Sequence, residues 1–242
     1  MTGASPKAGY GFFSFTEVTD PAAHHSYNEW HQLDHLPEQF PLPGIVYGQR
    51  WVSTPACRAA RAVSSGALDA IHYVTCYLMA EPIEQTLDDF FALGAELHRL
   101  DRFHADRRAH LTGPFALQRA AVAPRVLISA AAVPYRAHRG VYAIVEETPY
   151  PFDVPDASAL LDVRGVAGVW SFATRPGMAS GRWPAGDRRI TMCWLDDDPV
   201  AVSARVAPLV ADLERRGPEV RVTFAGPFET ITAWKWDWFD PA

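Results

Sequence analysis

The order of predicted strands and helices occurs twice in this chain of 242 residues, and this repetition constrains the fold more than any other feature. Period-two alternation and β-forming residues predict strands, and apolar stripes at helical spacing predict helices. The first series has strands at 11–18, 44–54, 70–80 and 110–122, with helices at 21–36 and 82–97. The second has strands at 139–148, 165–174, 188–195 and 219–232, with helices at 156–163 and 198–217. Both series are β-α-β-β-α-β.

A short local match indicates an internal duplication. The letters TGPF at 112–115 and AGPF at 225–228 each lie in the last strand of their series. A single unit of this kind leaves one sheet face uncovered by helices, and two units in one chain can bury these faces against each other. We therefore expect an α+β fold of two tandem ferredoxin-like units with antiparallel sheets packed face to face. The units would span residues 1–122 and 139–242, joined by a connection at 123–138.

Two inserted loops are predicted, each between the second and third strands of its unit. The first covers 55–69, and the second is the Gly/Pro-rich stretch at 176–187. A tail with alternating tryptophans, Trp234, Trp236 and Trp238, ends the second unit. We expect these side chains to seal an edge of the barrel, with a pocket wall or an interface as the alternatives.

Composition excludes several classes of partner. The formal net charge of −6 and the pI near 5.8 argue against nucleic acid or an anionic membrane surface as a partner. No apolar run reaches membrane-spanning length and no signal-peptide core is present. The three cysteines, Cys57, Cys76 and Cys193, are widely separated, as is typical of a reducing compartment. We expect a cytoplasmic protein.

The first predicted helix carries the most unusual side chains. Asp20 before Pro21 is a favourable N-cap, and Pro37 disfavours helical geometry at the residue before it. At about 100° per residue, Trp30, Leu33 and Leu36 form an apolar stripe that should face the core. The polar aromatic face on roughly the opposite side is formed by His24, Tyr27, His31 and His35.

The string N-x-W-H-x-x-x-H-x-P-E at 28–38, followed by Pro-Gly and a strand with G-x-R-W at 48–51, resembles EthD-like proteins. These belong to the dimeric α/β-barrel superfamily, whose unit is ferredoxin-like. The resemblance covers about residues 11–54. The chlorite-dismutase-like haem proteins share the two-unit plan, so the fold alone does not select a chemistry.

The resemblance implies a cofactor-independent enzyme of the lyase or isomerase type. It would perform acid/base chemistry on a small apolar or aromatic carbonyl compound, in decarboxylation, cyclisation, isomerisation or dehydration. His35 would be the acid or base, because the helix C-terminus should favour its protonated form and place its titration near working pH. His31 and His72 would assist. The predicted substrate-binding residues are Tyr27, Trp30, Tyr47, Arg50 and Glu38.

A second hypothesis is a non-catalytic or haem- or metal-dependent binding protein of the same fold. The pair His31 and His35 could chelate a transition metal with His24 or Glu38, but the H-E-x-x-H signature is missing. Haem or a hydrophobic metabolite could occupy the same pocket without turnover. We expect no bound cofactor or metal and a possible homodimer.

Overall fold

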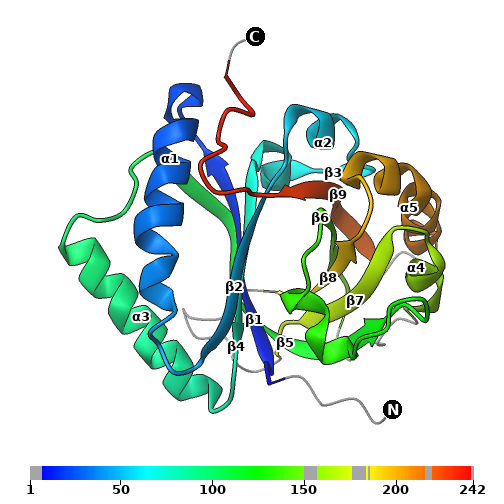
Figure 1. The fold of residues 1–242 in the computed structure, drawn as a ribbon, viewed down its shortest axis with the longest axis horizontal. Coiled ribbons are helices and arrows are strands. Elements are labelled where there is room, and N and C mark those ends of the chain that lie inside the picture. The colour runs from blue at the N-terminus through cyan, green and yellow to red at the C-terminus, as the bar shows by residue number, and fades with distance from the viewer. Residues whose placement is uncertain (1–6, 150–156, 176–183, 185, 216–219, 241–242) are drawn as a thin grey trace.

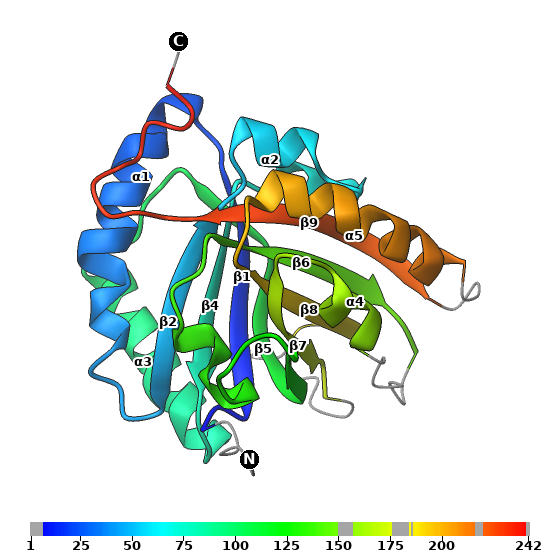
Figure 2. The same ribbon diagram turned by 45° about the vertical axis from the view of Figure 1, so that its right-hand side comes forward.

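Two α/β units face each other across a shared core in the computed structural model (Figure 1). In one unit α1 and α3 cover the outer face of the sheet, and in the other α4 and α5 do. Figure 2 shows the same two layers of strands from a second direction. The structure describes residues 7–149, 157–175, 184, 186–215 and 220–240.

The first unit follows the predicted order closely. Its strands are β1 (Tyr10–Val18), β2 (Ile45–Val52), β4 (Tyr73–Met79) and β5 (Arg107–Val122), and its helices are α1 (His24–Trp30) and α3 (Ile83–Arg99). The α1 helix begins after a 3₁₀ turn that the Asp20 side chain caps by accepting from the Ala22 N–H, as the sequence predicts. It continues as a π-helical turn (His31–His35) and a 3₁₀ turn (Pro37–Gln39).

The predicted loop at 55–69 is instead partly regular. It contains α2 (Pro55–Ala59), the short strand β3 (Val63–Ser64) and a 3₁₀ helix (Gly66–Ala70). The Thr54 hydroxyl caps α2 by accepting from the Cys57 N–H, and Arg61 donates to the Ile71 carbonyl. Side chains thus provide hydrogen-bond partners for backbone groups of this segment. The prediction of an irregular loop was therefore wrong for these residues.

The second unit has the same order of elements. Its strands are β6 (Gly140–Glu147), β7 (Val166–Ala173), β8 (Arg188–Leu195) and β9 (Arg221–Thr230), and its helices are α4 (Ser158–Asp162) and α5 (Pro199–Glu214). A 3₁₀ helix (Ala130–Tyr135) lies in the connection between the units. Most of the Gly/Pro-rich loop predicted at 176–187 lies outside the described residues, as does the predicted end of α5 at Gly217.

The strands form one sheet in the order β2-β4-β1-β5-β7-β8-β6-β9-β3, and β2 also pairs with β9. Because Trp51 lies opposite Thr230 and Val52 opposite Glu229, the ring of eight strands closes within the chain. In each unit the first strand pairs with the last, and the matching prolines stand opposite Phe12 and Tyr142. The structure thus confirms the two-unit α+β fold with facing sheets.

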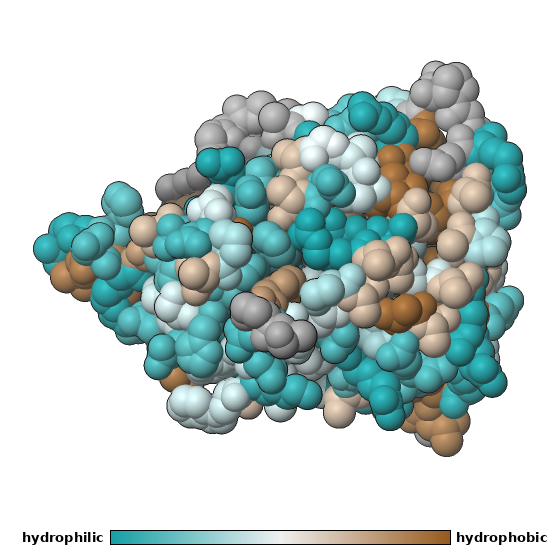
Figure 3. Space-filling model, turned by 90° about the horizontal axis from the view of Figure 1, so that it is seen from above, coloured by the Kyte–Doolittle hydropathy of each residue, from teal (hydrophilic) through white to brown (hydrophobic). Residues whose placement is uncertain are grey.

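The main core lies inside this closed sheet, between the strands of the first unit and those of the second. Alternate residues of each strand point into it, including Phe13, Phe15, Trp51, Trp170, Trp194 and Phe228. The opposite faces of the strands meet the helices in separate clusters. The outward surface seen from above is mostly hydrophilic, with hydrophobic patches between (Figure 3).

Candidate ligand-binding site

The helix that carries the histidine pair changes geometry where the two histidines lie. The Leu36 N–H donates to the His31 carbonyl at 2.8 Å, which is the i→i+5 bond of a π-helix. Single π-turns are rare and often occur at functional sites. His31 and His35 lie on one side of this turn, with their rings edge to face and the ring centroids 5.1 Å apart. Nothing in the residue pattern predicts this change of helical phase.

The helix does not divide into the two faces predicted, because Trp30, assigned to the core-facing stripe, lines the same cavity as His31 and His35. Tyr27 is 1% exposed and His31 5% exposed, whereas Leu33, assigned to the core-facing stripe, is 44% exposed. The physical reason lies in the sheet beneath, where the outward residues include Ser14, Thr16 and Thr75. A polar aromatic helix face complements this polar sheet surface, and hydropathy alone does not reveal that match.

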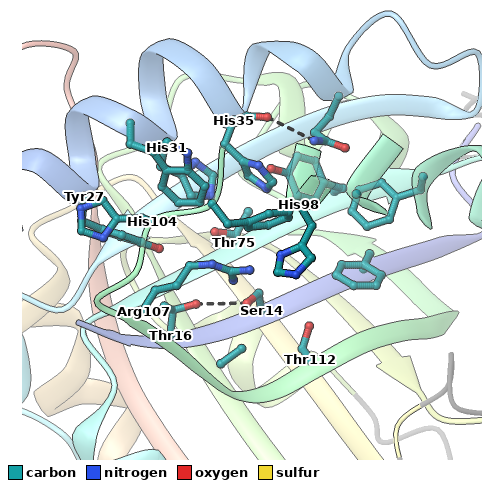
Figure 4. Close-up of a pocket in the computed structure, with 18 of the residues that line it drawn as sticks. Ser14, Thr16, Tyr27, His31, His35, Thr75, His98, His104, Arg107 and Thr112 are labelled. Carbon is teal, nitrogen blue, oxygen red and sulfur yellow. Dashed lines mark hydrogen bonds between the residues drawn. The ribbon is translucent and has the colours of Figure 1, made fainter. Parts of the chain in front are cut away.

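A cavity of about 810 Å³ lies between this helix, α3 and the outer face of the first sheet. Figure 4 shows His31 and His35 on the helix side, with Ser14, Thr16 and Thr112 on the strands opposite. The volume lies within the usual range for small-molecule and cofactor sites, roughly 300–1,000 Å³. The wall includes several aromatic side chains, among them Phe12, Tyr27, Trp30, Tyr77, Phe90 and Phe103.

Both histidines of the pair are held as neutral imidazoles. Burial lowers the pKa of His31 well below its usual value, and the nearby Arg50 and His35 lower it further. Burial, followed by the charge of Arg107, lowers the pKa of His35 to about 4. The expectation that the helix C-terminus raises the pKa of His35 was therefore wrong, because desolvation outweighs a helix-end effect that is typically worth about 0.3–1 kcal/mol.

The Nδ1 atoms of His31 and His35 are buried and have no hydrogen-bond partner among the described residues. Aromatic contacts position the two rings instead. Trp30 stacks on His35 with centroids 4.8 Å apart and planes 24° apart, and Tyr27 meets His31 edge-on at 6.0 Å. Since most buried polar atoms in proteins are paired, two unpaired nitrogens on neighbouring rings of one cavity wall are unusual.

The other predicted site residues are dispersed. Glu38 forms an ion pair with Arg102 at 2.7 Å and does not line the cavity. His72 accepts from the Val18 N–H at 3.1 Å beside the ring of His24, away from the cavity, and burial lowers its pKa to about 3. Tyr47 packs against the core between the sheets. Of the predicted site residues, the structure places Tyr27, Trp30, His31 and His35 in the cavity wall.

Sequence reasoning missed the turn between α3 and β5. The stretch RLDRFHADRRAH at 99–110 is highly charged, as is typical of solvated surface, yet Phe103, His104 and Arg107 line the cavity together with His98. Arg107 points into the cavity below the histidine pair (Figure 4). The one available signal was Phe103, an aromatic residue inside an otherwise charged turn.

A metal site without haem finds no support. Among the described residues, no cluster of three or more histidine, cysteine, aspartate or glutamate side chains could hold a metal ion. His24, considered as a third ligand, bonds to the Tyr73 hydroxyl at 2.9 Å and stacks on Phe239. The three cysteines are buried and free.

Of the helices in the described ranges, none has both the length and the apolar character needed to cross a membrane.

The tryptophan-rich tail lies against the first unit, as Figure 2 shows for the end of the chain. Trp236 donates through Nε1 to Gln32 Oε1 at 2.6 Å, and Gln32 lies in the π-turn between the two cavity histidines. Trp234 is mostly exposed and Trp236 is buried. The tail therefore contacts the helix that carries the site.

Comparisons with known proteins define the fold. No family profile and no curated protein sequence matches this chain. Among solved structures, the encapsulated DyP-type peroxidase of Mycobacterium smegmatis is similar at a TM-score of 0.53 and 10% identity, with 98% of this chain and 96% of that chain covered. A mutant chlorite dismutase of Candidatus Nitrospira defluvii, in complex with cyanide, is similar at 0.50 and 13% identity, with 93% and 92% covered. A protein provisionally described as a chlorite dismutase gives 0.52 and 10% identity, with 95% and 97% covered.

The chain therefore has the dimeric α+β barrel fold, built on ferredoxin-like units, along its whole length. Within that fold, the neighbours are chlorite dismutases and a DyP-type peroxidase, the former being the haem proteins whose two-unit plan the sequence predicts. This finding contradicts the expectation of cofactor-independent acid/base catalysis.

Proposed function

We propose that this chain binds haem in the cavity between α1, α3 and the first sheet. The observation that carries the proposal is the pair of neutral imidazoles of His31 and His35 in the wall of a large cavity that is also lined by several aromatic side chains. A neutral imidazole is the form that ligates a metal, and histidine is a common axial ligand of haem iron.

The residues of the cavity fit such a group in four respects. The volume of about 810 Å³ is large enough for a cofactor, and the aromatic wall suits a flat macrocycle. His31 or His35 would hold the iron, and Arg107 supplies a positive charge for acid groups at the edge of the ring. When bound, haem would supply one-electron or oxygen chemistry whose character depends on its axial ligand and on the polarity around it.

The chain's own contribution would be to bind, to orient and to exclude water. Ligating histidines usually donate their second ring N–H to a carboxylate or a carbonyl, and His31 and His35 lack such a partner among the residues that the structure describes. Stacking on Trp30 fixes the plane of His35 instead. Phe12 and Phe90, with ring centroids 4.7 Å apart, form an apolar part of the wall. The site therefore positions a ligand by aromatic packing more than by hydrogen bonds.

Kinship with EthD-like proteins, an ancestral duplication, unit boundaries at 122 and 139, a homodimer and a cytoplasmic location stay predictions. The duplication is supported by the matching prolines, which occupy equivalent registers in β5 and β9. Kinship with EthD-like proteins rests on residues 28–51 alone.

A titration with hemin tests the proposal. We expect one equivalent per chain to give a shifted, saturable Soret band. His31→Ala or His35→Ala should change the position of the band or weaken binding by at least tenfold. His25→Ala is the matched control, because His25 is an exposed histidine of the same helix. Hemin that binds without saturation, or a band that is the same in all three variants, would refute the proposal.

A further inference from the structure

The charges around the cavity are unbalanced. Arg107 lines the cavity, and its guanidinium lies 4.6 Å from the centroid of Phe103 and 5.8 Å from that of Trp30. Among the described residues no carboxylate forms an ion pair with Arg107. Burial lowers the pKa of this arginine, as expected for a cation that lacks an anionic partner.

A second cation lies directly behind the cavity wall. Arg50 is 3% exposed, and its Nε and Nη1 atoms have no hydrogen-bond partner among the described residues. Its remaining donor bonds to Asn28 Oδ1 at 3.0 Å, and its guanidinium lies over the rings of Tyr27 and Tyr73 at 5.1 and 5.3 Å. Arg50 therefore has no counter-charge in this part of the chain either.

The nearby acids are engaged elsewhere or lie at the rim. Asp34 and Glu38 both pair with Arg102, and Glu17 pairs with His110 at 2.7 Å. Asp101 is the one acidic side chain among the cavity residues that the structure describes, and it is exposed. Because His31 is neutral, the interior of the cavity has a net positive charge.

Burying a charge without a partner is costly, so an uncompensated pair of arginines is retained where a ligand supplies the anion. We propose that Arg107, with the charge of Arg50 behind it, binds the acid group of an aromatic ligand in this cavity. The ligand class is an aromatic body that carries a carboxylate or a similar anion. The inference rests on the proposed function only in using the same cavity, and haem with its two propionates is one member of the class.

Two naphthalene dyes that differ in charge test the inference without haem. The anionic probe is 8-anilinonaphthalene-1-sulfonate, and the neutral probe is N-phenyl-1-naphthylamine. We expect the wild-type protein to bind both, and Arg107→Met to weaken binding of the anionic dye by about tenfold or more, the range for a hydrogen bond to a charged group. Binding of the neutral dye should change less than twofold.

The matched control is Arg108→Met, which removes an exposed arginine from the next position of β5. It should leave both affinities unchanged, and thermal melting of both variants should confirm that they fold. As a measurement on the wild-type protein alone, 1-naphthoate should displace the anionic dye, and naphthalene at the same concentration should not.

Equal losses in the Arg107 and Arg108 variants, an anionic dye that is insensitive to Arg107→Met, or a wild-type protein that binds no anionic dye would each overturn the inference. The haem proposal fails separately. If the protein binds the anionic dye through Arg107 but gives no saturable Soret band, the anion-site proposal stands and the haem proposal is refuted. A protein that binds hemin and hemin dimethyl ester equally keeps haem and loses the anion site.

Discussion

Acid should destabilise this protein through the buried histidine at the end of the site helix. The folded protein lowers the pKa of His35 to about 4, whereas an unfolded chain has the ordinary value of about 6.5. Between these values the unfolded state binds more protons than the folded state, so the free energy of unfolding falls as pH falls from about 6.5 toward 4. Above this window the contribution of His35 is fully present.

The magnitude follows from the two pKa values. At pH 5 the unfolded histidine is almost entirely protonated and the folded one is about a tenth protonated, which gives a loss of about 2 kcal/mol relative to pH 8. His31, His24 and His72 also have lowered pKa values, so the whole protein should lose more than this. The contribution of His35 is therefore isolated by comparison with a variant.

The assay is urea unfolding at pH 8 and pH 5, followed by tryptophan fluorescence. In His35→Gln the difference in unfolding free energy between the two pH values should be smaller than in the wild type by about 2 kcal/mol. His25→Gln should retain the wild-type difference, since this side chain is exposed. If His35→Gln shows the full wild-type pH dependence, the argument from burial is refuted.

Two further predictions concern other parts of the fold. Glu146 and Arg189 form a bidentate, buried ion pair in the second unit, with both contacts at 2.8 Å. Glu146→Gln should therefore lower the unfolding free energy, measured by urea unfolding, by about 3–5 kcal/mol. A loss below about 1 kcal/mol would contradict this prediction. Trp236→Phe removes the hydrogen bond to Gln32 and should cost about 0.5–1.5 kcal/mol. Trp234→Phe, at an exposed position, should leave the unfolding free energy unchanged in the same urea assay. Equal losses of unfolding free energy in both variants would argue against the tail contact.

Local patterns in the sequence were sufficient for the order of elements. Alternation in GFFSFTEV and the helical stripe from Ile83 to Leu97 report burial on one face, and burial periodicity is a property of neighbouring residues. The closure of the barrel within one chain was also predictable, because each unit has one sheet face that must be covered. The segment at 55–70 was not, since its order depends on side chains that bond to distant backbone.

Only some residues of the site could be predicted from the sequence. The spacing of Tyr27, His31 and His35 marks one helix face, but which face turns inward depended on the polar strands beneath it. Arg107 enters the cavity from the start of β5, about 70 residues later in the chain, and no local rule links it to the helix. The pKa values of the histidines followed from this assembly. The sequence by itself determined which elements form and which of them carry unusual side chains. Only the tertiary structure decided which of those side chains share a low-dielectric cavity. The reason is that desolvation and unpaired charge depend on contacts between segments far apart in the chain.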